Sequence, residues 1–140
     1  MTYSPMQNVT EFHDKFHRDG KGRHERPISV STIDRRIKLI REEYEETMLE
    51  LNDMRYFINN SSPYEIPYQK VLLAKELADL IYVIYGTAEE LQIPLEEVFK
   101  AVHQNNMQKI WPDGEVHYNE FGKILKPPGF VPLDVSALFK

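Results

Sequence analysis

Cysteine is missing from the 140-residue sequence. Its absence excludes disulfides, thiolate zinc sites and cysteine nucleophiles, and it fits a reducing cytoplasm. No apolar run reaches the roughly 20 residues of a membrane-spanning helix, because Lys75, Glu76 and Asp79 interrupt the longest one, residues 71–91. The N-terminus carries no secretory signal. We therefore expect a soluble, cytoplasmic protein that does not bind a membrane.

Basic residues are outnumbered by acidic ones. Lysine and arginine total 17 against 22 Asp and Glu, which gives a net charge of −5 and argues against a nucleic-acid partner. The glycine-rich phosphate loop G-x-x-x-x-G-K-[ST] is absent as well. Hydrophobic residues at 41% and charged residues at 28% are ordinary for a globular protein. We expect a single domain over residues 1–140, with its core at about 30–111 and a tail at 112–140.

The first of two acidic segments has the periodicity of a helix. Glu42, Glu43 and Glu46 fall on one arc about 100° wide, whereas Glu45 points toward water. An apolar stripe beside this arc is expected to face the core. The stripe consists of Ile33, Ile37, Ile40, Tyr44, Met48 and Leu51. Three of four neighbouring glutamates are thus predicted to converge on one face.

The second acidic segment, residues 71–91, is apolar on nearly all sides. A helix of that kind belongs in the middle of a bundle. It nevertheless carries Glu76 and Asp79, which lie on the same side at i and i+3. Because burying an unpaired carboxylate is costly, these groups must be protonated, salt-bridged or bound to cations.

A short connection would place the two helices antiparallel and bring all five carboxylates to one pocket. Like charges that close cannot all stay ionised without a counter-charge, and Mg²⁺ supplies one and prefers oxygen ligands. The residues alone leave another interpretation open, in which the glutamates are a solvated face and Glu76 and Asp79 pair with lysines or arginines. The matched spacing on both helices favours a metal site, with Mg²⁺ as cofactor and Mn²⁺ as a substitute.

The pattern E-E-x-x-E at residues 42–46 and E-x-x-D at 76–79 resembles the all-α nucleoside triphosphate pyrophosphohydrolases. This MazG-like group includes dimeric dUTPases and phosphoribosyl-ATP pyrophosphohydrolase. Residues 105–109 resemble the group's later N-x-x-K element, and residues 122–129 resemble a C-terminal segment of some small MazG-like proteins. The resemblance covers about residues 30–130, and nothing similar is identified for the N-terminal thirty.

The resemblance implies an all-α bundle of four or five helices with an irregular C-terminal tail. It also implies Mg²⁺-dependent hydrolysis of a nucleoside triphosphate to the monophosphate and pyrophosphate. The implied metal ligands are Glu42, Glu43, Glu46, Glu76 and Asp79, and one of the first three would activate the attacking water. Asn106 and Lys109 would contact phosphate or sugar. The compact length and the C-terminal segment are more similar to the dUTPase type, so dUTP is the first candidate substrate.

The remaining candidates for substrate binding follow in the chain. A helix that restarts at Leu95 places His103 on the same face as Asn106 and Lys109, where the three become candidates for phosphate contact. Residues 116–118 and 123–125 could be two short strands around residues 119–122, and Lys123 and Lys126 flank the apolar pair at residues 124–125. Solvated lysines are the simpler interpretation, and phosphate contact is the other. Trp111 could pack in the core or line a base pocket, and we favour the core or an interface.

The N-terminal part is predicted to contain a helix over residues 5–17, with Val9, Phe12 and Phe16 toward the core. His13 and His17 are expected at its flank or in solvent rather than on a metal. Residues 17–31 are predicted as a loop, either solvated or closing as a flap over a triphosphate. Its basic candidates for phosphate contact are Lys21, Arg23 and Arg26.

Helix boundaries follow from capping and turn residues. Ser31 is expected to begin the first acidic helix in an approximate capping box with Asp34, and that helix runs to about Ile58. Pro67 fits the first turn of the second helix. Gly86 and the turn at residues 92–94 are expected to end it.

The predicted function is therefore hydrolysis of a (d)NTP between the α and β phosphates by metal-activated water. Alternatives are a phosphoribosyl-ATP pyrophosphohydrolase-type activity and a non-catalytic helical interaction module. A di-iron carboxylate bundle would need E-x-x-H pairs, which do not occur. Because the 71–91 segment has more apolar surface than a small bundle needs, we expect a homodimer or higher homo-oligomer.

Overall fold

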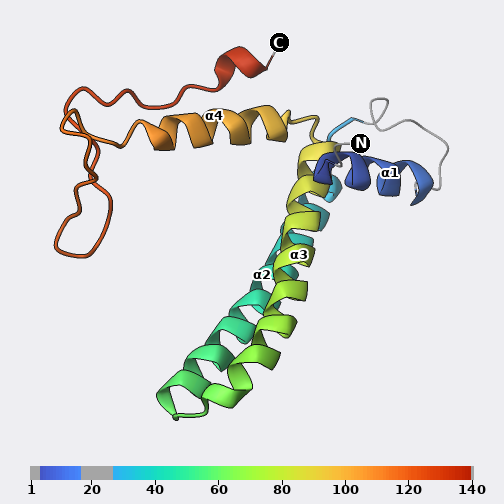
Figure 1. The fold of residues 1–140 in the computed structure, drawn as a ribbon. Helices are drawn as coiled ribbons and strands as arrows, with labels where there is room; N and C mark the ends of the chain where they lie inside the picture. Colours follow the sequence, from blue (N-terminus) through green and yellow to red (C-terminus); the bar gives the residue numbers. More distant parts are fainter. Residues whose placement is uncertain (1–3, 17–26, 140) are drawn as a thin grey trace. The chain divides into compact units, whose positions relative to one another are not determined.

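The computed structural model describes residues 4–16 and 27–139. These residues form four α-helices and two short 3₁₀ turns (Figure 1). In chain order they are α1 (Pro5–Phe16), α2 (Val30–Asn59), η2 (Pro63–Glu65), α3 (Ile66–Glu90), α4 (Leu95–Met107) and η3 (Ser136–Leu138). The prediction of an all-α fold with an irregular C-terminal tail is confirmed. No helix in the described ranges is both long and apolar enough to cross a membrane.

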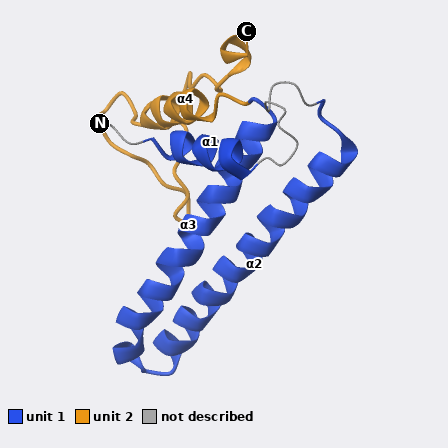
Figure 2. Ribbon diagram, turned by 90° about the vertical axis from the view of Figure 1, so that its right-hand side faces the viewer, with its two compact units in different colours: residues 1–92 blue, residues 93–140 orange. Residues whose placement is uncertain are grey.

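The chain divides into two compact units, residues 1–92 and 93–140, which are described separately (Figure 2). In the first unit, α2 and α3 form a long antiparallel hairpin, and α1 packs on α3. The second unit holds α4 and the tail. The two strands predicted in the tail meet only through one antiparallel bridge, between Tyr118 and Ile124.

The helix α2 begins two residues earlier than a capping box at Ser31 requires. Ser29 is the N-cap, and its side-chain oxygen accepts a hydrogen bond from the Thr32 backbone N–H at 3.2 Å. The predicted pairing of Ser31 with Asp34 is therefore wrong, because Ser29 already satisfies a free N–H of the first turn. The end of α2 at Asn59 and the position of Pro67 in the first turn of α3 agree with the predictions.

Gly86 lies inside α3, which continues to Glu90, so the prediction that this glycine helps to end the helix is wrong. A Cβ atom at Gly86 would lie 2.8 Å from Nη1 of Arg36 and 3.2 Å from Nε2 of His13. The missing side chain therefore lets the side chains of α1 and α2 approach the α3 backbone closely. His13 is buried as a result, contrary to the prediction that it lies at a flank or in solvent.

The α2 surface that faces α3 is partly polar. Thr47 is 2% exposed, and its hydroxyl donates to the carbonyl oxygen of Glu43 at 2.7 Å and lies 3.4 Å from that of Glu76. The buried Gln69 of α3 donates its amide to the carbonyl oxygen of Glu50 at 3.0 Å. These bonds satisfy polar groups that would otherwise be costly to bury between the helices.

The predicted core stripe is rotated away from α3 for half of its members. Ile37, Tyr44 and Leu51 are 48%, 52% and 40% exposed, whereas Ile33, Ile40 and Met48 are half-buried. Apolar residues lie on more than one side of α2, and periodicity alone selected the wrong side. An apolar face of the hairpin is left uncovered as a consequence.

In α1, Val9 is buried as predicted, but Phe12 and Phe16 are exposed. The two phenylalanine rings stack with centroids 4.6 Å apart, and Phe12 meets Tyr82 of α3 edge-on at 5.7 Å. The predicted flap residues and His17 lie outside the described residues.

Candidate metal centre

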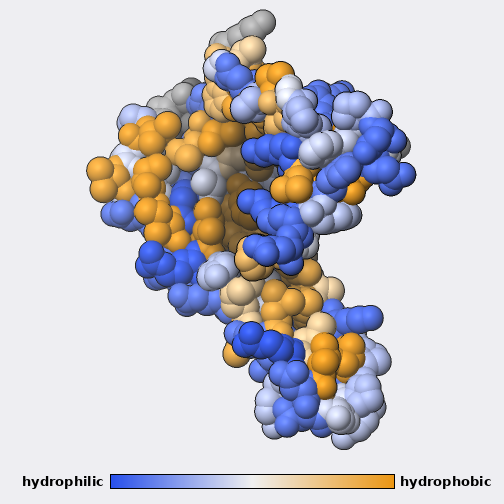
Figure 3. All heavy atoms as spheres, turned by 90° about the vertical axis from the view of Figure 1, so that its left-hand side faces the viewer, coloured by the Kyte–Doolittle hydropathy of each residue, from blue (hydrophilic) through white to orange (hydrophobic). Residues whose placement is uncertain are grey.

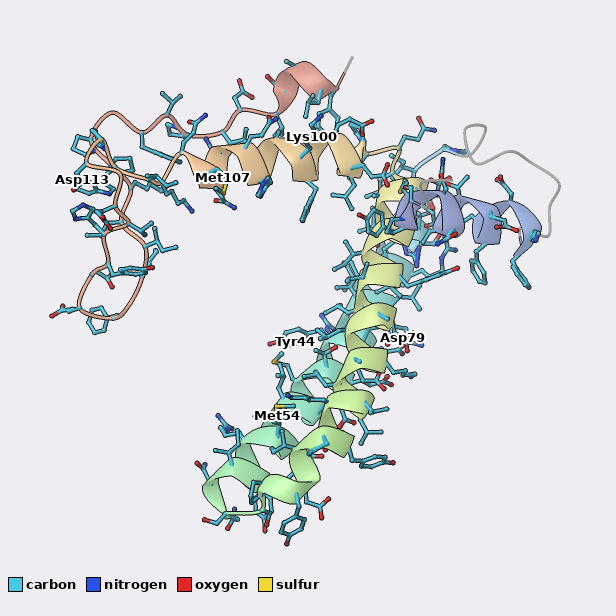
Figure 4. All side chains as sticks on the ribbon, in the orientation of Figure 1. Tyr44, Met54, Asp79, Lys100, Met107 and Asp113 are labelled. Carbon is cyan, nitrogen blue, oxygen red and sulfur yellow. The ribbon has the colours of Figure 1, made fainter. Side chains whose placement is uncertain are left out.

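Three carboxylates meet in the middle of the hairpin. Glu43 and Glu46 project from successive turns of α2, and Glu76 projects from α3. One oxygen atom from each lies within 4.8 Å of the others. Figure 4 shows Asp79 of α3 at the same level of the hairpin as Tyr44 of α2. Asp79 is linked to this cluster through Lys75, which forms ion pairs with both Asp79 and Glu76. The antiparallel pairing predicted from the short connection thus brings together acids that are far apart in sequence.

Two oxygen atoms of this cluster are buried without a hydrogen bond. Oε2 of Glu43 and Oε2 of Glu76 have no partner among the described residues. A buried acceptor without a donor carries an uncompensated desolvation cost. A hard divalent cation prefers carboxylate oxygens and would offset that cost, so this donor set fits Mg²⁺ or Mn²⁺.

The electrostatics of the cluster also favour a cation. The pKa of the Glu43 carboxyl is raised above its usual value, first by burial and then by the negative charge of Asp79, with smaller contributions from Glu76 and Glu42. The pKa of the Glu46 carboxyl is raised as well, mainly by its hydrogen bond with Glu76 and then by the charge of Glu43. Both groups therefore hold protons more readily than ordinary glutamates, through burial for Glu43 and the hydrogen bond for Glu46, with charge repulsion adding to each.

Lys75 is the residue of this site that the sequence pattern did not identify. Its Nζ lies 2.8 Å from Oδ2 of Asp79 and 3.2 Å from Oε1 of Glu76. Hydrogen bonds to these two acids, that to Asp79 first, raise the pKa of Lys75. The lysine side chain is 66% exposed, so it can leave the acids without a large loss of packing. The i, i+4 spacing of Lys75 and Asp79 was the available signal.

Glu42 lies at the edge of the cluster. It is exposed, and its Oε1 is 3.8 Å from Nζ of Lys38. Of the five predicted ligands, then, three lie together, Asp79 is held by a lysine beside them, and Glu42 is on the outer side of α2. The other interpretation of the sequence, in which acids pair with lysines, therefore holds for Asp79 and for one oxygen of Glu76, since both pair with Lys75.

The other predicted site residues lie in the second unit. Nζ of Lys109 donates to Oδ1 of Asn106 at 2.9 Å, although α4 ends at Met107 and Lys109 lies beyond it. His103 is an exposed residue of α4, and Lys123 and Lys126 are exposed in the tail. Their contact with substrate stays a prediction.

Comparison with known proteins identifies one family. The family described as phosphoribosyl-ATP pyrophosphohydrolase matches residues 9–106. The match begins at residue 9, so it includes residues 9–16 of α1, a part of the chain for which the sequence patterns identified nothing similar. It includes both acidic helices and ends at Asn106. No curated protein matches the chain.

The family match identifies the class of reaction. Pyrophosphohydrolases are hydrolases that act on acid anhydrides, here of nucleotide-like substrates, and the family is typically metal-dependent. An acidic cluster that could bind a metal ion lies within the matched region. The chain belongs to the phosphoribosyl-ATP pyrophosphohydrolase family, within the MazG-like all-α nucleoside triphosphate pyrophosphohydrolase superfamily.

Proposed function

We propose that the protein is a Mg²⁺-dependent pyrophosphohydrolase that cleaves a (d)NTP between its α and β phosphates. The observation that carries the proposal is the carboxylate cluster between α2 and α3, with two buried oxygens that lack partners among the described residues. Family membership supplies the reaction class. dUTP is the first substrate to test. A phosphoribosyl-ATP pyrophosphohydrolase-type activity is the second candidate, favoured by the description of the matching family.

Glu43, Glu46 and Glu76 would hold the metal ion, and Asp79 would join them once Lys75 moves away. A bound Mg²⁺ would supply positive charge for phosphate oxygens and make a bound water more acidic. Among the glutamates, Glu46 is the candidate for accepting the proton of the attacking water, because it is exposed and its pKa is raised. Glu42 would act through its charge at the edge of the cluster.

The test of this function is a panel of canonical and damaged nucleoside triphosphates, with phosphoribosyl-ATP included, in Mg²⁺ or Mn²⁺. The expected products are a nucleoside monophosphate and pyrophosphate. Glu46→Gln should abolish pyrophosphate release and retain helical content. Asp53→Asn, an exposed residue of the same helix away from the cluster, serves as the control for charge. Orthophosphate as product, or full activity in Glu46→Gln, would contradict the proposal.

We further propose that a second copy of the chain covers the apolar face of the hairpin. Val9 and Ala88 are the only hydrophobic residues of the described part that are fully buried, at 1% and 3% exposure. A groove of about 640 Å³ runs along α2 and α3. Its lining includes Ile37, Ile40, Tyr44, Leu80 and Ile84. Figure 3 shows hydrophobic side chains gathered on the surface of the hairpin. A contiguous exposed apolar groove of this kind is typical of a protein–protein interface.

The charges at this groove favour a second copy over an unrelated partner. Arg41 and Glu45 both line it, one turn apart on α2, and neither forms an ion pair within the described ranges. In a two-fold interface the same patch meets itself, so Arg41 of one copy can face Glu45 of the other. The two-fold symmetry would form this ion pair twice, once in each direction across the interface.

A charge swap tests the interface. Arg41→Glu and Glu45→Arg should each weaken self-association in sedimentation equilibrium, because each places like charges opposite one another. The double variant should associate as the wild type does. Tyr44→Lys should give a monomer. A wild-type chain that is monomeric at high concentration would contradict the interface.

The single-domain organisation and the cytoplasmic location stay predictions. So does the contact of Asn106, Lys109, His103, Lys123 and Lys126 with substrate. The substrate contacts can be tested within the same nucleotide panel by substituting these five residues and separating effects on KM from effects on kcat.

A further inference from the structure

The tail of the second unit folds around a small cavity of its own. Gln108 and residues 110–112, after α4, form one wall and residues 127–131 form the other, and the volume between them, which is open to solvent, is about 250 Å³. Sites for drug-sized ligands have volumes of about 300 to 1,000 Å³. The cavity therefore has room for one ring system rather than for a whole large ligand.

The walls are held in place by hydrogen bonds. The indole Nε1 of Trp111 donates to the carbonyl oxygen of Leu125 at 3.1 Å, and the Asn105 amide donates to that of Val131 at 3.0 Å. The Phe130 N–H donates to the Pro127 carbonyl at 3.1 Å, across a turn in which Gly129 has φ +79°. Since each wall is tied to its surroundings, the cavity is formed before any ligand binds, which lowers the cost of binding.

The cavity combines aromatic side chains with polar surface of similar extent. The single N–H of Trp111 is already used, and His117 packs on the indole with ring centroids 4.2 Å apart. His117 is itself held by Asp113, at 2.8 Å between Nε2 and Oδ2. The other lining side chains are apolar apart from Gln108, whose amide has no hydrogen-bond partner among the described residues. Such a combination suits a flat heterocycle that stacks and takes one amide contact.

Positive charge lies beside the cavity. Nζ of Lys126 is 5.5 Å from the ring centroid of Phe130, over its face. Lys126 is exposed, so its ammonium group can reach an anion attached to a bound ring. The ligand that matches both features is an aromatic ring that carries a negative group.

We propose that this cavity binds the base of a nucleotide, with the ring against Trp111 and Phe130 and the phosphate near Lys126. The choice of a nucleotide rests on the proposed function. Binding to the cavity itself needs no metal and no hydrolysis. Within this cavity, Gln108 and the shape of the walls would discriminate between bases.

Trp111 is the only tryptophan of the chain, so its fluorescence reports directly on this cavity. The experiment titrates the full chain in EDTA with nucleoside monophosphates, with the corresponding nucleosides and with inorganic pyrophosphate. A free tryptophan derivative corrects for absorption by the ligands. The expected result is a saturable change with the monophosphates, a weaker one with nucleosides and none with pyrophosphate.

Substitutions then locate the site. Loss of one stacking partner should weaken monophosphate binding by about tenfold or more, so Phe130→Ala should raise Kd by that factor. Phe130→Leu keeps apolar volume without a ring and covers the case in which Phe130→Ala does not fold. Lys126→Gln should weaken the monophosphate and leave the nucleoside unchanged. Phe121→Ala, at a residue that is 85% exposed and outside the cavity, and Lys100→Gln on α4 are the matched controls.

Three results would overturn the proposal. They are the absence of a saturable change, an equal change with pyrophosphate, and an unchanged Kd in both Phe130 variants. The outcome is separable from that of the hydrolase proposal. If the chain binds monophosphates in this assay but releases no pyrophosphate with Mg²⁺, the base site is supported and the hydrolase proposal is not. If it releases pyrophosphate but shows no binding in this assay, the hydrolase proposal is supported and the base site is not.

Discussion

Replacing Glu43 with glutamine should stabilise the protein in EDTA and remove most of its stabilisation by divalent cations. Oxygens of Glu43 and Glu76 lie within 4.8 Å of one another. Two unit charges at that distance repel by about 1 kcal/mol in a water-like medium and by about 3 kcal/mol at the effective dielectric of a protein surface. Because both side chains are only half-buried, we expect a gain of about 1 to 2 kcal/mol, which is roughly 3 to 6 °C in Tm.

In the presence of divalent cations, the wild type should become more stable than Glu43→Gln. At a concentration of 100 times Kd, a ligand stabilises the folded state by about 2.7 kcal/mol. The wild type should gain about that much in Mn²⁺, and Glu43→Gln should gain little. Thermal unfolding followed by circular dichroism, in EDTA and in Mn²⁺, measures both effects. Asp53→Asn removes the same charge from the same helix and should behave as the wild type. A Glu43→Gln protein that is less stable in EDTA, or that keeps the full shift in Mn²⁺, would refute the reasoning.

Other predictions concern pH and packing. The folded-state pKa of Glu43 is raised above the usual 4.5, chiefly by burial, so the folded chain binds more protons than the unfolded chain between these two values. Stability in EDTA should therefore fall as pH rises from about 4.5 through the raised pKa, and urea denaturation across pH should show a smaller fall in Glu43→Gln. Glu90→Gln leaves the buried Arg36 without its nearest counter-charge and should cost about 3 kcal/mol, whereas the exposed Glu97→Gln should cost nearly nothing in the same assay. Val9→Ala should lower the free energy of unfolding by about 2 kcal/mol, and an unchanged value would mean that α1 is not docked on α3.

The sequence alone was sufficient to predict the two long helices and the convergence of their acidic side chains. Helical periodicity and the spacing of glutamates are local properties, so α2, α3 and the convergence of Glu43, Glu46 and Glu76 followed from them. The side of α2 that faces α3 did not follow. The periodicity predicts that the apolar Ile37 and Tyr44 face the core, but both are exposed and Thr47 is buried. Its hydroxyl donates to a backbone carbonyl oxygen, a contact that the sequence cannot reveal.

Two errors have the same physical origin. Glycine is a poor helix former, so the sequence predicts a helix end at Gly86, but Gly86 lies inside α3 where two side chains approach the backbone. The sequence likewise predicts His13 at a flank or in solvent, because its burial depends on that same contact with Gly86. Lys75 was overlooked because a motif of acids does not specify which neighbouring base lies among them. Each error concerns contact between elements rather than the elements themselves.

The most direct test is anomalous diffraction from a crystal of the protein soaked in a manganese salt. The expected result is an anomalous peak bound by oxygens of Glu43, Glu46 and Glu76 at about 2.0 to 2.6 Å, the range for hard divalent cations, with Lys75 turned away from Asp79. A crystal in Mn²⁺ with no peak beside these oxygens, and with Lys75 still paired to Glu76 and Asp79, would contradict the metal site on which the proposed hydrolysis depends.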